Sequence, residues 1–564
     1  MSNSKKQNIL VALAWPYVNG DIHIGHLAGY LLPGDFFARF HRLIGNNVLM
    51  VSGADSHGTP VTIEADNLKM HPKDVVEKYY QEHLKLIQKG DLSFDIYTKT
   101  TTENHKKIVQ DLFLKLLLQG YIIRKTTKQF YSKEDNKFLP DRYVKGNCPF
   151  CGAQKINSDQ CDICGKIIDP EELIKPVSKL TGNPVTLKET EHYFIDWYKL
   201  TPFLKKYFSS HKKNWRQWIQ AETGQWLERG LKPTAITRDL EWGIELPIDR
   251  IPKDLLIDNI ESKKIYVWFE AVIGYLSASV EWNNKKYRDF WYNSKSKHYY
   301  FMGKDNLVFH TIFWPGELYA YDKKIHLPDV CAINQFLNLE GQKFSKSKGI
   351  TVDAQYILDT YGSDQVRFYF TSIMPEESDA NFSWTDFQSR INDVLISNFG
   401  NFINRSLTLA KDISIDKKIN LDKKIISQST KSYKKIIKSL SGVHFKDYYN
   451  EFINFSGFAN KYISLQKPWS LKESDPKKFK EIMINCLYLV LCLDLFSKPI
   501  LTKGSVKIEN MLGIKIDSWP KDKDLEKYLK KLLIQIKINN VAPLYQRIET
   551  SQIQTEQDKL PKLN

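Results

Sequence analysis

The first apolar run of this chain, residues 9–14, is followed closely by a helical pattern over residues 25–42. The sequence His23-Ile24-Gly25-His26 stands where that pattern begins. An apolar run, a turn and a helix in this order are typical of a parallel βαβ unit. The helix N-terminus in such a unit has unpaired N–H groups and the positive end of the helix dipole, which favour phosphate. The segment therefore predicts a phosphate site in an α/β fold, where Gly25 lets a base or ribose approach the backbone.

The alternation of strands and helices continues, is interrupted and then resumes. Residues 47–51 predict a second strand and residues 72–86 a second helix, whereas residues 121–234 break into polar, aromatic and cysteine-bearing segments. Strand-like runs return at residues 264–269 and 298–302, each followed by a helical stretch. This pattern predicts a Rossmann-like, doubly wound parallel sheet that is split by an insertion.

Beyond residue 387, apolar residues recur at helical spacing within residues 391–407, 448–462 and 479–496. Such spacing predicts an all-α bundle. The longest apolar run, residues 486–496, is interrupted by Asp494 and is shorter than the ~18 residues that a membrane-spanning helix needs. We therefore expect no membrane partner. Residues 524–538 carry a further helical pattern before a polar tail.

Four cysteines form two closely spaced pairs inside the predicted insertion, Cys148 with Cys151 and Cys161 with Cys164, and a glycine follows each pair. This spacing predicts one tetrahedral thiolate Zn²⁺ site. Four protein ligands leave no open position, so the metal is expected to be structural. The chain has seven cysteines, an odd number, with four in one cluster. That usage favours a reducing, cytoplasmic location over a secreted disulfide framework.

A polar segment far downstream, Lys343-Phe344-Ser345-Lys346-Ser347-Lys348-Gly349, has the donors that a loop closing over a triphosphate needs. Lys and Arg (81) outnumber Asp and Glu (65), which leaves a formal charge of +16. This surplus favours a polyanionic partner such as nucleic acid, although a lysine-rich composition accounts for it equally well.

The histidine segment and the lysine–serine segment together resemble the paired signatures of class I aminoacyl-tRNA synthetases. Further segments are similar to motifs of the methionyl-tRNA synthetase family: Ala14-Trp15-Pro16-Tyr17, Gly53-Ala54-Asp55-Ser56-His57-Gly58-Thr59, Val267-Trp268-Phe269-Glu270-Ala271-Val272-Ile273-Gly274-Tyr275, Gly303-Lys304-Asp305-Asn306-Leu307-Val308-Phe309-His310 and Lys467-Pro468-Trp469. The resemblance covers residues 9–469 in family order. It departs at Trp15, Val272 and Asn306, where some members have other residues, and Phe344 replaces a methionine.

The resemblance implies a ligase that activates methionine with ATP and Mg²⁺ and transfers it to elongator and initiator methionine tRNA. It implies catalytic roles for His23, His26, Lys343 and Lys346. The ATP site would be formed by Pro16, Tyr17, Asn19, Gly20, His23, Gly25, His26, Gly303, Asp305 and Lys346. The methionine site would be formed by Ala14, Trp15, Tyr17, Asp55, Trp268, Ala271, Tyr275 and His310.

The chemistry of the substrate agrees with these residues. Asp55 can pair with the ammonium group of methionine. The aromatic side chains suit contacts with the thioether sulfur, each worth a fraction of a kcal/mol to about 1.5 kcal/mol. Tyr275 and His310 are expected to donate weak hydrogen bonds to the sulfur.

In the bundle, Asn398 and Trp469 match positions that read the anticodon in this family. The family arginine falls here on Phe402, and we expect Arg405 to replace it. Stacking of a base on tryptophan is worth about 1–3 kcal/mol.

These features predict a catalytic half over residues 1–120, the zinc insertion over 121–234 and a second catalytic half over 235–330. A connecting segment over 331–386, the anticodon bundle over 387–512 and a tail over 513–564 follow. Because few residues follow the bundle, we expect a monomer, and residues 541–549 resemble a tail that folds back on the body. Two alternatives stay open: another class I synthetase of the same subclass, and a catalytically silent tRNA-binding protein.

Overall fold

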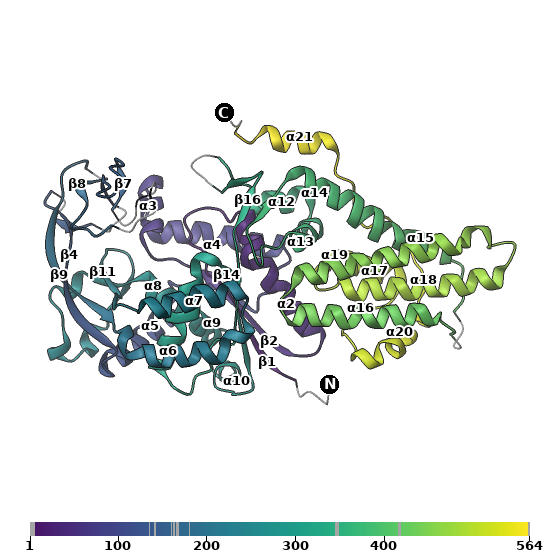
Figure 1. Cartoon of the computed structure of the whole chain (residues 1–564), viewed down its shortest axis with the longest axis horizontal. Coiled ribbons are helices and arrows are strands. Elements are labelled where there is room, and N and C mark those ends of the chain that lie inside the picture. The colour runs from purple at the N-terminus through teal and green to yellow at the C-terminus, as the bar shows by residue number, and fades with distance from the viewer. Residues whose placement is uncertain are drawn as a thin grey trace.

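The structure, a computed structural model, describes residues 6–134, 136–139, 143–158, 161, 164, 168–179, 181–344, 349–415 and 419–561. Figure 1 shows two halves side by side, an α/β half that contains the N-terminal strands and a bundle of long helices. The α/β half is built on a five-stranded sheet in the order β15-β14-β1-β2-β3, and every neighbouring pair is parallel. Its strands are β1 (Asn8–Leu13), β2 (Asn47–Ala54), β3 (Ile96–Lys99), β14 (Lys297–Gly303) and β15 (Val330–Asn334).

The strand order reverses between β1 and β14, which pair in register from Ile9 with Lys297 to Leu13 with Phe301. In a doubly wound sheet, ligands bind beyond the carboxyl ends of the strands at this reversal. The central strands are almost fully buried, as expected for a parallel sheet with helices on both faces. The covering helices include α1 (Ile24–His26), α2 (Leu32–Leu43), α4 (Pro72–Lys89), α5 (Glu103–Leu118), α9 (Gly274–Trp282), α10 (Tyr287–Trp291) and α11 (Trp314–Tyr321).

The predicted insertion interrupts the sheet between β3 and β14, and Figure 1 shows it at the far side of the α/β half. Its long antiparallel pair leads to a small sheet that carries the cysteines. Tyr143 connects this small sheet to α3 (Thr59–Leu68), because its hydroxyl bonds Thr62 Oγ1 at 3.1 Å and Asp66 Oδ2 at 3.0 Å. The insertion contains β4 (Ile122–Ser132), β5 (Lys137–Phe138), β6 (Val144–Asn147), β7 (Ile156–Asn157), β8 (Ile174–Ser178), β9 (Thr186–Ile195), α6 (Trp197–His211), α7 (Gln217–Arg229) and β10 (Thr234–Ala235).

Two predicted elements differ from the structure. Residues 264–269 were expected to form one strand, but only β13 (Lys263–Ile265) is extended, in an antiparallel sheet with β11 (Thr237–Asp239) and β12 (Ile244–Glu245). The rest forms the helix α8 (Val267–Glu270), because a short apolar run fits a buried helix as well as a strand. The helix expected over 524–538 is α20 (Leu525–Leu533), which ends earlier.

A connecting segment leads from the sheet to the bundle. It contains β16 (Leu337–Leu339), β17 (Gln342–Lys343), α12 (Ala354–Tyr361), α13 (Ser363–Ser372) and β18 (Ala380–Phe382). The bundle contains α14 (Trp384–Ser389), a π-helical stretch (Arg390–Gly400), α15 (Asn401–Ala410), α16 (Lys423–Ser441), α17 (Phe445–Gln466), α18 (Pro476–Ser497) and α19 (Thr502–Leu512). The apolar run of α18 forms its buried core. Among the described residues, none of the helices is both long and apolar enough to cross a membrane.

The tail returns across the molecule, as expected from residues 541–549. The Tyr545 hydroxyl donates to Asp364 Oδ2 at 3.0 Å, and Asn392 exchanges two hydrogen bonds with the backbone of Ile548. The last helix, α21 (Thr550–Asp558), then packs against α14, and its Glu556 bonds the hydroxyl of Tyr356 on α12 (Figure 1).

A buried ion pair joins the two halves. Arg367 of α13 donates to Asp35 Oδ2 of α2 at 2.6 Å, and both side chains are fully buried. The same guanidinium donates to the carbonyls of Ile500 at 2.7 Å and Pro499 at 3.2 Å, directly after α18. Burial opposes ionisation of Asp35, but Arg39, Arg367 and Ser93 outweigh it and hold its pKa at about 2.

Replacing Arg367 with methionine should remove this junction. We expect Arg367→Met to lower the free energy of unfolding by about 3–5 kcal/mol, because a buried carboxylate loses one of its two arginine partners and several buried carbonyls lose a donor. Urea unfolding followed by tryptophan fluorescence measures the loss. The matched control is Arg250→Met, which removes an exposed pair with Asp111 and should cost at most about 1 kcal/mol. Equal losses in the two variants would contradict the role of Arg367.

The same junction predicts a dependence on pH. Because the pKa of Asp35 is lowered from 3.8 to about 2 in the folded chain, its ionised form stabilises the fold fully above its ordinary pKa. That contribution is lost as the pH falls through the interval between the two values. Arg367→Met should therefore flatten the loss of stability in this acid range.

Candidate active site

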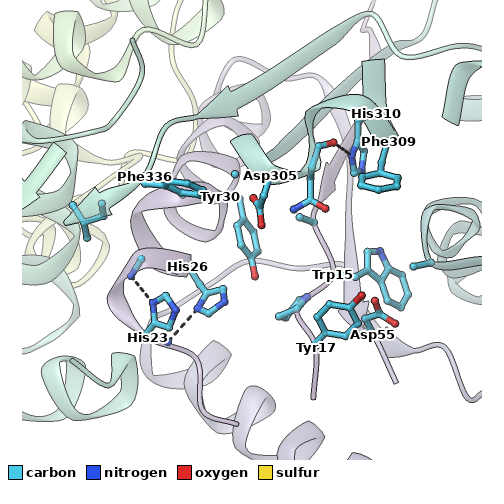
Figure 2. A pocket seen from close by; sticks show the side chains of 18 of the residues that line it. Trp15, Tyr17, His23, His26, Tyr30, Asp55, Asp305, Phe309, His310 and Phe336 are labelled. Carbon is cyan, nitrogen blue, oxygen red and sulfur yellow. Dashed lines mark hydrogen bonds between the residues drawn. The ribbon is translucent and has the colours of Figure 1, made fainter. Parts of the chain in front are cut away.

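A cavity of about 460 Å³ lies beyond the carboxyl ends of β1 and β14, at the reversal of strand order. It is lined by most of the side chains that the sequence predicts for ATP and methionine: Ala14, Trp15, Pro16, Tyr17, His23, Gly25, His26, Asp55, Trp268, Ala271, Tyr275, Gly303, Asp305, His310 and Lys343. Figure 2 shows how those that it labels surround one space. Asn19 and Gly20 belong to the same loop but do not line the cavity, and Lys346 lies outside the described residues.

Backbone N–H groups orient the two histidines at the start of the first helix (Figure 2). Nδ1 of His23 accepts the N–H of Gly25 at 3.1 Å, and Nδ1 of His26 accepts the N–H of His23 at 3.2 Å. Because Nδ1 is an acceptor in both rings, a neutral imidazole carries its proton on Nε2. Both side chains therefore offer an Nε2–H donor. A Cβ on Gly25 would lie 2.8 Å from the His23 ring, so glycine at this position makes room for the histidine itself.

The histidine segment and the lysine–serine segment meet in space. The ring of Phe344 stacks on the ring of His23, with centroids 4.9 Å apart and planes inclined by 12°. Beyond the loop, the N–H of Ile24 donates to the carbonyl of Val352 at 3.0 Å. Residues on both sides of the lysine–serine loop are thus held against the first helix.

Asp55 presents a buried carboxyl group to the cavity. It directly follows β2, its side chain is buried, and its Oδ1 has no hydrogen-bond partner among the described residues. Its backbone is fixed to the loop after β1, since its N–H donates to the carbonyl of Pro16 at 2.8 Å. Burial raises the pKa of Asp55 well above its usual range, and the nearby carboxylate of Glu270 raises it further. Such a carboxyl group is suited to a cation that enters the cavity.

Tyr275 and His310 form a hydrogen-bonded pair in the cavity wall. Nδ1 of His310 donates to the carbonyl of Asn306 at 2.9 Å (Figure 2), so Nε2 of the neutral ring accepts the Tyr275 hydroxyl proton at 2.7 Å. Burial lowers the pKa of His310 to about 4, which keeps the ring neutral. The Nδ1 proton of His310 and the hydroxyl proton of Tyr275 are therefore both donated to partners within the cavity wall. The expectation that these side chains donate to a sulfur atom does not match this arrangement, which offers ring surfaces and the hydroxyl oxygen instead.

Two tryptophans complete the apolar part of the cavity. The Trp15 ring fills a slot between two glycines, because a Cβ on Gly53 or on Gly274 would lie 2.2 Å or 2.7 Å from it. Trp268 is 40% exposed and stacks on Phe309 with centroids 4.4 Å apart. Trp15 is thus a fixed wall, whereas Trp268 borders the solvent.

The opposite end of the cavity is more polar. Burial raises the pKa of Asp305, which follows the carboxyl end of β14. Burial and Asp305 also raise the pKa of Tyr30, whose buried hydroxyl has no partner among the described residues. The Phe336 ring is 42% exposed, and Lys304 Nζ lies 4.1 Å from its centroid.

Several lining residues were not predicted from the sequence: Tyr30, Phe309, Gln335, Phe336, Leu337 and Asn338. The sequence does contain a signal for Tyr30 and for residues 335–338. Tyr30 lies four residues after His26, on the same helix face. Residues 335–338 directly follow β15, where side chains reach the carboxyl edge of a parallel sheet.

Three π-helical stretches among the described residues carry candidate functional side chains. Leu27–Leu31 includes Tyr30, Phe309–Phe313 includes His310, and Arg390–Gly400 includes Asn398. A π-turn adds a residue to a helix and so changes which side chains share a face, and such turns are frequent at functional sites. In such a stretch the regular helical period alone does not determine which side chains share a face.

The four cysteines of the insertion converge. All four sulfur atoms lie within 4.8 Å of one another, with 3.8 Å between those of Cys148 and Cys164 and 3.7 Å between those of Cys151 and Cys161. Four thiolates around Zn²⁺ at about 2.3 Å would be about 3.8 Å apart, whereas a disulfide needs about 2.05 Å. Gly152 turns the first pair with a φ of +73°. The arrangement fits a zinc ion and excludes disulfides.

The bundle brings together part of the predicted anticodon set. The Arg405 guanidinium lies 5.2 Å from the ring centroid of Trp469, which is 48% exposed. Asn398 is held against α17, since its Oδ1 accepts hydrogen bonds from Asn460 at 2.6 Å and Ser456 at 3.0 Å. Phe402, at the family's arginine position, is fully buried and cannot contact a ligand.

The comparisons with known proteins agree with this geometry. Residues 9–407 match the family model for class I tRNA synthetases (M), and residues 417–561 match that for the anticodon binding domain of methionyl tRNA ligase. The methionine–tRNA ligase of Roseiflexus sp. (strain RS-1) is 42% identical over 526 residues, covering 90% of this chain and 87% of the relative. That of Thermobifida fusca is 38% identical over 532 residues, with the same coverage.

Among solved structures, Mycobacterium tuberculosis methionyl-tRNA synthetase in complex with methionyl-adenylate has the same fold, with a TM-score of 0.74 at 22% identity. The match covers 96% of this chain and all of that one. The sequence motifs, the cavity at the strand reversal, the cysteine cluster and these matches together show that the chain belongs to the methionyl-tRNA synthetase family of class I aminoacyl-tRNA synthetases.

Proposed function

We propose that this chain is an aminoacyl-tRNA ligase that activates methionine with ATP and transfers it to methionine tRNA. The observation that carries the proposal is one cavity with two different ends. One end has a buried carboxyl group, Asp55, beside an uncharged aromatic wall, and the other has the Nε2–H donors of His23 and His26. The first suits an amino acid with a neutral side chain, and the second suits a polyphosphate.

In the first step, a carboxylate oxygen of methionine attacks the α-phosphorus of ATP. The bond from that phosphorus to the bridging oxygen breaks, and pyrophosphate leaves with the electron pair. Asp55 orients the substrate through its ammonium group, while His23 and His26 donate to phosphate oxygens as negative charge develops. This reaction needs positioning and charge stabilisation more than a covalent nucleophile. The Mg²⁺ that accompanies ATP would add positive charge at the phosphates.

The polar end of the cavity is proposed to hold the adenosine. Gly303 and Asp305 lie at the end of β14, where the ribose of a nucleotide meets a doubly wound sheet. The exposed ring of Phe336 offers a stacking surface. Lys343 borders the cavity, and we assign a phosphate role to it and to Lys346.

In the second step, a terminal ribose hydroxyl of the tRNA attacks the methionyl carbonyl and AMP leaves. We propose that the bundle over residues 387–512 binds the anticodon of both elongator and initiator methionine tRNA. Trp469 would stack on a base and Arg405 would contact it or its phosphate. We further infer a cytoplasmic monomer in which residues 1–120 and 235–330 form the catalytic halves, 331–386 connect them to the bundle, and 513–564 form a tail.

The amino acid specificity can be tested directly. We expect pyrophosphate exchange into ATP with methionine, and none with leucine, isoleucine, valine or cysteine. Exchange with another of these amino acids and none with methionine would favour a different class I synthetase. Tight tRNA binding without exchange or charging would favour a silent RNA-binding protein.

Asp55→Asn should weaken methionine binding. Losing a buried charge partner costs about 2–5 kcal/mol, or roughly 30-fold or more in the KM for methionine, with the KM for ATP little changed. Since the pKa of Asp55 is raised in the empty cavity, the affinity of the unmodified chain for methionine should fall as the pH is lowered below that pKa. Exchange kinetics across the acid range measure both effects. An unchanged KM for methionine in the variant would exclude Asp55 as the ammonium partner.

Trp469→Ala should separate the two steps. We expect tRNA charging to weaken by about 1–3 kcal/mol, the value of one stacked base, while methionine-dependent exchange stays nearly intact. Charging assays and exchange assays on the same preparation measure the two. Leu465→Ala, at another exposed apolar side chain near the end of α17, is the control for loss of surface area. Loss of both activities in Trp469→Ala would indicate that the side chain stabilises the fold and does not bind tRNA.

The cysteine cluster predicts one Zn²⁺ per chain. Cys161→Ser or a strong chelator should remove the metal and lower the stability of the insertion, because a closed thiolate site contributes folding energy. Metal analysis and thermal unfolding measure the two effects. Cys331→Ala, which alters a buried cysteine outside the cluster, should keep the metal. A full equivalent of zinc in Cys161→Ser would contradict the assignment.

A further inference from the structure

A second buried carboxylate, Glu270, lies directly behind the cavity and takes no part in the two proposed steps. It ends α8, next to the cavity-lining residue Ala271, and is fully buried. Its Oε1 lies 2.9 Å from Nδ1 of His57, and its Oε2 lies 2.7 Å from Nε2 of His105. A carboxylate can only accept hydrogen bonds, so both of these ring nitrogens carry protons.

His57 and His105 each contact a residue that lines the amino acid end of the cavity. The backbone N–H of His57 donates to the carboxyl group of Asp55. The ring of His105 lies beside the ring of Trp15, with centroids 6.4 Å apart. Glu270 thereby connects the segment after β2, the start of α5 and the segment that carries Trp268.

The remaining contacts of the network leave the two histidines little freedom. Nδ1 of His105 lies 2.8 Å from the Ser277 hydroxyl on α9. The Thr100 hydroxyl lies 3.4 Å from Nδ1 of His57 and accepts the N–H of Ser56 at 3.0 Å. Burial alone would raise the pKa of Glu270, but His57 and His105 outweigh it and lower that pKa, so the group is an anion. A buried anion is costly unless it is paired.

We propose that Glu270 is a positioning residue for amino acid binding, which acts through His57 and His105 to hold the Asp55 carboxylate where the substrate ammonium binds. The inference rests on the proposed function and deepens it. Glu270 does not touch the substrate. Its effect is therefore expected on ligands that carry an ammonium group and not on the other parts of the substrate.

Glu270→Gln is the test, because glutamine keeps the size of the side chain but offers only one acceptor oxygen to two N–H donors. The probes are methionine, methioninol, which keeps the ammonium, and 4-(methylthio)butanoate, which lacks it. We expect methionine and methioninol to bind about tenfold to a hundredfold more weakly, as for a lost hydrogen bond to a charged group. Binding of 4-(methylthio)butanoate and the KM for ATP should change by no more than about twofold.

Two further variants keep the result interpretable. Glu376→Gln removes another buried carboxylate, which accepts the N–H of Phe445 and does not line the cavity, and should leave the ratio of methionine to 4-(methylthio)butanoate affinities unchanged. In the Asp55→Asn background, Glu270→Gln should have an effect of about twofold or less, because both act on the same contact.

The outcomes separate the two proposals. If the unmodified chain binds no methionine, the proposed function fails and this inference fails with it. If it binds methionine but Glu270→Gln has no effect, or weakens all three probes equally, only the positioning role is overturned. Full additivity with Asp55→Asn would also overturn it.

Discussion

The buried ion pair between Asp35 and Arg367 is the interaction on which the arrangement of the two halves depends. The helical segment that contains Asp35 begins at Ile24, directly after His23, and includes His26, so the two cavity histidines and the junction belong to one element. Arg367 also binds backbone carbonyls at the end of α18. Because a buried guanidinium must satisfy all its donors, small displacements of the bundle are unfavourable. The relation between the cavity and the bundle therefore depends on this buried polar contact, together with hydrogen bonds such as that from the backbone N–H of Trp519 to the carbonyl of Leu43.

The same principle recurs around the cavity, where buried polar groups orient neighbours and do not react. Hydrogen bonds from backbone N–H groups determine the tautomer of His23 and of His26. The carbonyl of Asn306 fixes His310, which in turn takes the proton of Tyr275. The cavity thus presents a neutral wall at one end and hydrogen-bond donors at the other. The net charge of +16 plays no part in this arrangement, which is made by individual side chains and backbone groups.

Most of the fold could be predicted from local patterns. Buried strands with turns and amphipathic helices indicated the doubly wound sheet, and the cysteine spacing indicated the closed metal site, because both depend on contacts or ligands close in sequence. The prediction failed where contacts between residues distant in sequence decide the structure. Val267–Glu270 is a helix because tertiary packing decides between helix and strand for a short apolar run. By contrast, Phe402 is buried and Arg405 lies beside the half-exposed ring of Trp469, so the expected replacement of the family arginine by Arg405 is compatible with the fold.

The sequence by itself determined which chemical groups are available: two histidines at a helix start, a carboxyl group after the second strand, aromatic residues and four thiols. Only the tertiary structure decided what these groups can do. The contacts of the folded chain put the proton of His23 and of His26 on Nε2 and direct the Tyr275 proton to His310. They leave one oxygen of Asp55 without a hydrogen-bond partner among the described residues, and they bring Glu270 against His57. Hydrogen-bond direction and the ionisation of a buried group depend on neighbours that are distant in sequence, so no local pattern can encode them.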